Sequence, residues 1–239
     1  MRKVIVTGKI QNPKSNKLSI NYLFDYITNK DSVLCFDSLN ENNEFSVEFD
    51  LDNPVYAKFN TSKEFTNLYL SPGDSLYITL DADAFDSTIT YAGNGNEVNN
   101  YLAQKLLKSL SFGENEEVYY SQNQEDFYET MDSVNKIQVG DLENFGIQNA
   151  TFVENEKQNL DYAFGISLLN YDDYNAYYAE RDSSIELIDL YKNKILNLIA
   201  VTGTNGKSSV AEFFYQILSF SKVSAASIGT LGVISENYK

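Results

Sequence analysis

The stretch "LYLSPGDSLYITL", residues 68–80, decides how the first part of the chain folds. Apolar and polar residues alternate on both sides of a polar break, which is the pattern of β-strands with one buried face. In the break, Pro72 fixes φ for the first corner of a turn, and Gly73 tolerates the positive φ of the second corner. The stretch therefore predicts two strands that are joined by a tight turn.

The same alternation continues on both sides of this stretch. Short runs such as "KVIVTGKI", "EFSVEFDL" and "TITYAG" are separated by polar turns from residue 2 to about residue 91. Short strands at this spacing are typical of an antiparallel sandwich or a barrel-like sheet. We therefore predict an α+β chain whose first domain, residues 1–92, is antiparallel and β-sandwich-like.

The apolar residues change to a helical spacing after "GNGNEVNNYL", residues 93–102. A first helix places Val98, Leu102, Leu106 and Leu107 on one face. Three more helices are expected: one with Phe127, Met131 and Val134, one over about 149–178, and one over about 183–195 with Ser183 or Ser184 as N-cap. The apolar side of the long third helix comprises Phe152, Leu160, Ala163, Phe164, Ile166, Leu168 and Leu169. Residues 93–197 are thus predicted to form a helical subdomain.

The composition argues against several kinds of site. The chain has 34 acidic and 18 basic residues, and this net charge of −16 argues against a nucleic-acid partner. It contains no histidine, which removes imidazole bases, Ser-His-Asp and Cys-His nucleophiles and the commonest zinc ligand. The single cysteine, Cys35, cannot form an intrachain disulfide or a CxxC pair, and we expect it on a buried strand.

The sequence also bears on compartment. The N-terminal "MRKVIVTGKIQ" has no apolar run long enough for a signal peptide, and nothing later approaches a membrane span. As written, the chain is expected in the cytoplasm. If a leader has been lost, its first part would belong to the periplasm or the envelope.

The composition shifts at about residue 198. Residues 198–239 hold two glutamates and three lysines, a net charge of +1. Since the whole chain carries −16, residues 1–197 carry −17. The runs "LNLIAVTG", "TNGKSSVAEFFYQILSF" and "SAASIGTLGV" predict a strand, a loop followed by a helix, and a second strand. This is the order of a βαβ unit, with which α/β domains open.

The loop "VTGTNGKSS", residues 201–209, has the residue types of a phosphate-binding site. Gly203 and Gly206 let backbone N–H groups wrap a phosphate at a helix N-terminus. Lys207 supplies a point charge for the β- and γ-phosphates, and Ser208 supplies a hydroxyl for Mg²⁺. The general pattern GxxxxGK[ST] is not met, because its first glycine falls on Val201.

"TGTNGKSS", followed by an amphipathic helix and "SIGTLGV", resembles the ATP-binding opening of the central domain of the Mur ligases, in particular the MurE branch. In that family ATP phosphorylates a substrate carboxylate, which an amine then attacks, with Mg²⁺ neutralising charge. The resemblance implies ATP and Mg²⁺ as cofactors, with Ser208 on the metal. It implies a cofactor site made of Gly203, Thr204, Asn205, Gly206, Lys207, Ser208 and Ser209.

Only the opening of that domain lies within residues 198–239. We therefore expect a truncated βαβ unit that binds ATP as a fragment of a peptidoglycan-precursor ligase. No catalytic residue is assigned, and ligation by this chain alone is not expected.

Residues of about 3–180 resemble a different group. "VTGKIQNPKSNKLSINY" and "LYLSPGDSLYITLDADAFDSTITYAGNGNEVNNYLAQ" are similar to the region before the thioredoxin-like domain in TlpA-like envelope thiol-disulfide oxidoreductases. This resemblance implies a non-catalytic domain that contacts a protein partner of unknown identity. It is the alternative function of the chain.

The two resemblances point to different compartments. We therefore interpret the chain as a hybrid that is joined between about residues 182 and 198, and an inert fusion product is a third possibility. About forty residues of βαβ cannot cover both faces of a parallel sheet. The tail is expected to be poorly ordered, docked weakly on the helices, or dependent on self-association.

Two smaller motifs have competing interpretations. "DADAFD", residues 81–86, alternates carboxylates as calcium loops do, but Asp86 and Ala92 occupy the positions where an EF-hand needs glycine and glutamate. A solvated acidic turn is favoured. The tyrosine-rich "LLNYDDYNAYYAE", residues 168–180, suits a carbohydrate or partner surface or a helix packed on a sheet, and the packed helix is favoured.

Overall fold

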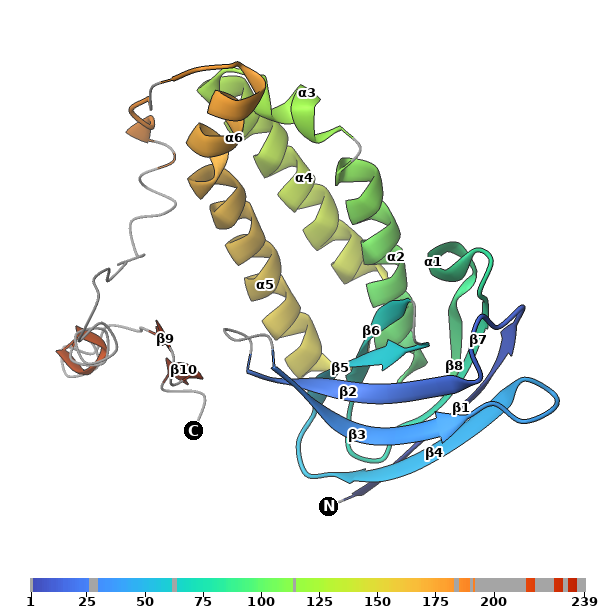
Figure 1. The fold of residues 1–239 in the computed structure, drawn as a ribbon. Helices are drawn as coiled ribbons and strands as arrows, with labels where there is room; N and C mark the ends of the chain where they lie inside the picture. Colours follow the sequence, from blue (N-terminus) through green and yellow to red (C-terminus); the bar gives the residue numbers. More distant parts are fainter. Residues whose placement is uncertain are drawn as a thin grey trace.

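The computed structural model describes residues 2–25, 30–61, 64–113, 115–182, 185–189, 191, 214–217, 226–229 and 232–235. Two four-stranded sheets are followed by a helical region, so the architecture is mixed α+β (Figure 1). The first sheet has the order β4-β1-β7-β8, with bounds Glu44–Leu51, Arg2–Gln11, Ser75–Asp81 and Thr90–Asn94. The second has the order β3-β2-β5-β6, with bounds Lys30–Ser38, Lys17–Asp25, Val55–Asn60 and Phe65–Leu70.

The core of the β-rich part is made by the alternate residues that the sequence pattern marked as apolar. On β1, Val4, Val6 and Ile10 are buried, and they belong to one cluster with residues of both sheets. Gly8 interrupts the series because the Phe45 ring occupies its place. A Cβ at Gly8 would overlap the carbonyl oxygen of Ile78 and lie 2.7 Å from Cε1 of Phe45, so a larger residue would displace the backbone of β7 as well as that ring.

The turn between β6 and β7 is confirmed, but its role is not the expected one. Gly73 has a φ of +99°, and the N–H of Asp74 donates to the carbonyl oxygen of Ser71 at 3.0 Å. However, β6 belongs to the second sheet and β7 to the first. The turn therefore carries the chain from one sheet to the other instead of closing a hairpin.

One strand pair departs from the predicted antiparallel arrangement. β1 pairs with β7 in parallel, with Ile5 opposite Ser75, whereas the other pairings within the two four-stranded sheets are antiparallel. Strands β2 to β6 lie between these two partners in the sequence. Alternation of apolar residues fixes which face is buried but not the direction of a distant partner, which is why the sequence missed this pair.

The helical region differs from prediction at its end. The expected third helix is two helices, α5 and α6, separated at Asn170. The expected fourth helix is absent over residues 185–188, because the N–H groups of Ile185 and Ile188 donate to the side chains of Asp172 and Gln124, whereas the described residues Asp189 and Tyr191 are helical. The candidate caps Ser183 and Ser184 lie outside the described residues. The helices are α1 Phe85–Thr88, α2 Asn96–Gly113, α3 Glu116–Tyr120, α4 Gln124–Asn144, α5 Ala150–Leu169 and α6 Tyr171–Tyr178.

Helix α2 joins the helical region to both sheets. The side-chain amide of Asn99 accepts from the N–H of Tyr69 at 2.9 Å and donates to its carbonyl oxygen at 3.0 Å. The neighbouring Asn100 makes the same pair of bonds with Tyr91, at 3.0 and 2.8 Å. Tyr69 is on β6 and Tyr91 on β8, which are edge strands of different sheets. Two consecutive amides thus satisfy backbone groups of both edges and fix the base of α2.

The described parts of the tail match the prediction only in part. Phe214–Ile217 is helical, as expected. The last expected strand is instead two strands, β9 (Ala226–Gly229) and β10 (Gly232–Ser235), paired antiparallel. The first strand of the predicted βαβ unit lies outside the described residues.

Candidate functional site

The predicted phosphate loop falls outside the part of the chain that the structure describes. This applies to every residue of that site: Gly203, Thr204, Asn205, Gly206, Lys207, Ser208 and Ser209. The described turn that follows it, Phe214–Ile217, leaves the side chains of Phe214 and Ile217 exposed. The loop therefore stays a prediction from its sequence.

The chain enters this tail from a fixed point at the far end of the helices, where α3 and α6 lie (Figure 1). Tyr191 is completely buried, and its hydroxyl donates to the carbonyl oxygen of Gln124 at 2.8 Å. Its ring makes an edge contact with Tyr171 at a centroid distance of 5.5 Å. The side-chain amide of Gln124 donates to the carbonyl oxygen of Glu186 at 2.9 Å and accepts from the N–H of Ile188 at 2.8 Å. Tyr191 thus anchors the chain just before the tail.

A charged cluster supports the same anchor. Arg181 donates to the carboxylate of Asp172 at 2.8 Å and to the amide oxygen of Asn175 at 3.1 Å. The Asp172 carboxylate also accepts from the N–H of Ile185 at 3.1 Å. The hydrogen bond from Arg181 lowers the pKa of Asp172 below its ordinary value. Asp172 is therefore ionised at neutral pH and holds Arg181 and Ile185 against α6.

The tyrosine-rich stretch combines packing and exposure. Tyr171 is buried in an aromatic cluster with Phe127 and Tyr191, so it packs among helices and not on a sheet. Burial likewise raises the pKa of Tyr120, in the same cluster, to about 12. Tyr174 and Tyr177 remain exposed. Most of the aromatic area here is structural, and only two rings face solvent.

A buried carboxylate in the helical region is also structural. Glu156 is 2% exposed and accepts from the ammonium of Lys105 at 2.6 Å and from the hydroxyl of Tyr101 at 3.3 Å. Both donors come from α2 and the acceptor from α5. The pair thus pins the two helices together, and its atoms are engaged with each other.

The acidic stretch 81–86 behaves as a turn. The carboxylate of Asp81 accepts from the Asn12 side chain and from the N–H of Asp83, both at 3.0 Å. Asp83 forms an ion pair with Lys14. Over the described residues, no group of three or more Asp, Glu, Cys or His side chains is placed to hold a metal ion.

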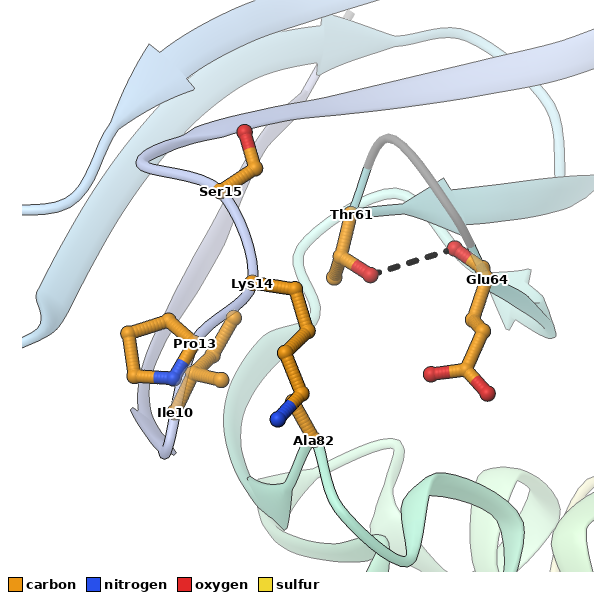
Figure 2. A pocket seen from close by; sticks show the side chains of 7 residues that line it. All are labelled: Ile10, Pro13, Lys14, Ser15, Thr61, Glu64 and Ala82. Carbon is orange, nitrogen blue, oxygen red and sulfur yellow. Dashed lines mark hydrogen bonds between the residues drawn. The ribbon is translucent and has the colours of Figure 1, made fainter.

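Two hollows lie on the surface of the described residues. Figure 2 shows one beside the loop after β1, where the Thr61 hydroxyl donates to the carbonyl oxygen of Glu64 at 3.2 Å. Its volume is about 10 Å³, which is room for about one water molecule. Its lining consists of Ile10, Pro13, Lys14, Ser15, Thr61, Glu64 and Ala82. The other is a shallow, open surface at the ends of β2 and β3. Neither has the enclosed form of a typical small-molecule site.

The cysteine is partly buried on β3, as the sequence suggested. Burial raises the pKa of Cys35 to about 11, and a hydrogen bond with the backbone of Ile20 offsets this only in part. The thiol is therefore protonated at neutral pH and is a poor nucleophile.

The sequence missed a surface on α5. Ala163, Ile166 and Leu169 were expected on the buried side, but all three are exposed. The buried residues Phe152, Glu156, Leu160, Phe164 and Leu168 recur at every fourth position, which is the spacing that would have identified the true inner face. Tyr162, Ile166 and Leu169 form a second stripe that faces away from it. In α2, similarly, Leu107 is exposed whereas Tyr101 is buried.

Comparisons with known proteins concern only a short part of the chain. No family model matches it. A stretch of 43 residues is 60% identical to UDP-N-acetylmuramoyl-L-alanyl-D-glutamate--2,6-diaminopimelate ligase of Rickettsia felis, covering 18% of this chain and 8% of the ligase. A stretch of 49 residues is 57% identical to the ligase of the same name from Rickettsia bellii, covering 20% of this chain and 10% of that protein. The chain thus spans a tenth or less of the length of these curated relatives.

One solved structure also matches, a proposed cell adhesion protein from Bacteroides ovatus. It has a TM-score of 0.22 and 16% sequence identity, over 40% of this chain and 45% of that one. Among the described helices, none combines the length and apolar composition needed to cross a membrane.

Proposed function

We propose that residues 198–239 bind the phosphates of Mg-ATP through the loop 203–209, and that the 239-residue chain does not ligate an amino acid by itself. The observation that carries this proposal is the identity of 57–60% over 43–49 residues to diaminopimelate-adding ligases. The segment 198–239 has 42 residues, which agrees with the length of that match. Such identity over so short a stretch supports common ancestry of the segment with the ATP-binding opening of these ligases.

The residue types give each part of the loop a role. The N–H groups of Thr204 to Lys207 would surround the phosphates, because the flanking glycines let the backbone approach closely. The Lys207 ammonium would neutralise the β- and γ-phosphates, and the Ser208 hydroxyl would be a ligand of Mg²⁺. The described helical turn Phe214–Ile217 lies on the C-terminal side of the loop, within the stretch where the sequence predicts the helix of such a site.

The charge distribution supports an anionic ligand in the tail and nowhere else. Residues 192–239 contain five lysines and two glutamates, a net charge of +3. Since the whole chain carries −16, residues 1–191 carry −19. The domain repels a nucleotide at long range, whereas the tail attracts it. Binding is therefore expected to be local to the loop.

Calorimetric titration of the full chain with Mg-ATP tests the proposal, with Lys207→Ala as the loop variant. Lys222→Ala is the matched control, since it removes a lysine of the same segment outside the loop. We expect saturable binding to the unchanged chain and to Lys222→Ala, and at least a tenfold weaker affinity for Lys207→Ala. Equal affinities in all three proteins, or no binding heat in any, would contradict it. Ser208→Ala should lower the affinity for Mg-ATP more than it lowers the affinity for metal-free ATP, because the variant loses a ligand of the metal.

We propose a second, non-catalytic function for residues 1–191, namely contact with a protein partner in the bacterial envelope. Its support is that the buried side chains of Asn99, Glu156 and Asn175 are bonded within the fold, and that the thiol of Cys35 stays protonated, so none of these groups is available for chemistry. The resemblance to TlpA-like proteins supplies the compartment. Sequencing the uninterrupted transcript from a clonal culture is the test. A leader upstream and a CxxC-bearing domain downstream of the β-rich part would support this function, and their absence from the transcript would contradict it.

A further inference from the structure

The stripe on α5 stands out because it carries no charge on a strongly acidic chain. Tyr162, Ile166 and Leu169 are 65%, 55% and 37% exposed. Their spacing of four and three residues places them on one face of the helix, opposite the buried series. Nearer the N-terminus, the same face continues with uncharged amides: Asn155, Gln158 and Asn159. An uncharged apolar helix face on a soluble surface is typical of a face that another element covers.

The chain itself offers a matching face. Val210, Phe213, Phe214 and Ile217 follow the i, i+3, i+4, i+7 pattern of an amphipathic helix. Within this run the structure describes the helical turn Phe214–Ile217, where both Phe214 and Ile217 are exposed. Two exposed apolar helix faces of this kind can bury each other by ridge-into-groove packing.

The anchor at Tyr191 places the start of the tail at the C-terminal end of α5, the end at which the stripe stops. Tyr191 contacts Tyr171, which is only two residues beyond Leu169 at the end of α5. The eighteen residues 192–209 could span up to about 60 Å if fully extended, whereas the stripe from Leu169 to Tyr162 is about 10 Å long. The tether therefore permits docking and gives the helix an effective concentration in the millimolar range.

The charges favour this occupant over a second copy of the chain. The segment after Tyr191 has a net charge of +3, and the part before it −19. Two copies that met through α5 would bring together two strongly negative domains, which repel each other. Residues 208–220 themselves hold one glutamate and no lysine, but Lys207 and Lys222 flank them, so the segment as a whole brings positive charge to the acidic domain.

From these observations we infer that the segment 208–220, which contains the described helical turn Phe214–Ile217, docks in the same chain on the stripe formed by Tyr162, Ile166 and Leu169 of α5. This contact covers the apolar face of the tail helix, which in its 42-residue segment has too little sheet to pack against. It does not depend on nucleotide binding, so it stands or falls separately from the function proposed for the loop.

Hydrogen exchange of the peptide 208–220 in the full chain, without nucleotide, tests the docking. In Ile166→Asp the buried charge should break the contact, and the peptide should exchange at least tenfold faster than in the unchanged chain. The matched control is Ile137→Asp on α4, where the isoleucine is 63% exposed and should leave the exchange unaltered. Equal exchange in the unchanged chain and in Ile166→Asp would overturn the inference. So would protection that is lost on dilution from about 100 μM to about 1 μM, because that result assigns the face to a second copy.

A cysteine pair gives a second measurement that does not rely on disrupting the contact. In a Cys35→Ser background, Ile166→Cys with Ile217→Cys should form a disulfide within the monomer under mild oxidation. Ile137→Cys with Ile217→Cys is the control and should form at least tenfold less. Equal yields from the two pairs would overturn the inference.

Discussion

The described residues up to Tyr191 and those beyond it differ in how far their apolar side chains are buried and their polar groups are bonded. Before Tyr191, apolar faces lie between two sheets and among helices, and amides such as Asn99 bond the sheet edges. Beyond it, the described helical turn leaves Phe214 and Ile217 exposed. The nucleotide motif lies outside the described residues, whereas the packed part of the chain carries no such motif. Motif and fold therefore need separate tests.

The largest expected effect concerns the boundary between the two parts. Tyr191→Ala should lower the free energy of unfolding by about 3 to 5 kcal/mol, because it leaves a cavity among Phe127 and Tyr171 and removes a buried hydroxyl bond. Urea denaturation followed by circular dichroism measures it. Tyr177→Ala is the control and should change stability by less than about 0.5 kcal/mol, since that ring is exposed. A loss below about 1 kcal/mol for Tyr191→Ala would place the boundary earlier in the chain.

The next effect concerns the joint between the sheets and the helices. Asn99→Ala should cost about 2 to 4 kcal/mol, because it leaves the N–H and the carbonyl oxygen of Tyr69 buried without their side-chain partners. Asn100→Ala should cost less, since Asn100 is only half-buried and water can replace its bonds to Tyr91. Thermal unfolding of both variants gives the comparison. Equal losses of stability in the two variants would show that burial does not decide how much each asparagine contributes.

A smaller effect is the pH dependence of the anchor. Because Arg181 lowers the pKa of Asp172, the carboxylate adds stability that is complete above its unfolded-state pKa, near 3.8, and is lost as the pH falls through the folded-state value. The unchanged chain should therefore be more stable than Asp172→Asn at about pH 6, and the difference should shrink towards about pH 2.5. Urea midpoints of both proteins across this range measure it. A stability difference that does not change with pH would show that the charge of Asp172 does not contribute to the anchor.

The smallest expected effect tests the independence of the two parts directly. A chain that ends at Lys194 keeps the Tyr191 anchor, and its free energy of unfolding should lie within about 1 kcal/mol of that of the full chain. Docking of the tail on α5 adds at most a small term, because three partly exposed side chains are covered. A loss of more than about 2 kcal/mol in urea denaturation would show that the tail is an integral part of the fold.

Much of the fold was predictable where local pattern decides structure. The alternation around Val4 and Val6, the turn at Pro72 and Gly73, and the change to a helical period after Asn96 follow from the residues themselves. The end of the helical region was not predictable in the same way. Ile185 and Ile188 have helical spacing with their neighbours, but their N–H groups bond to Asp172 and Gln124, which are far away in the sequence.

The candidate sites also differ in whether local sequence or tertiary packing defines them. Gly203, Gly206, Lys207 and Ser208 were identified by residue type and spacing, because a phosphate loop is a local structure. The stripe on α5 was assigned to the wrong face, because Ile166 and Leu169 lie close to the buried series in sequence. The every-fourth spacing of Phe152 to Leu168 marks the inner face, and the packing of α4 against α5 covers it.

By itself, the sequence determined the strands and most helices, the absence of histidine chemistry and the acidity of the first part, and it predicts a phosphate-binding loop at residues 203–209. These properties depend on composition and on neighbours a few positions away. The tertiary structure alone decided that β1 and β7 run parallel, that Asn99 and Asn100 bond two sheet edges, and that Tyr191 closes the helical end. Each of these joins residues that are distant in sequence, and the choice among such partners depends on how the whole core fills its volume and satisfies its buried polar groups.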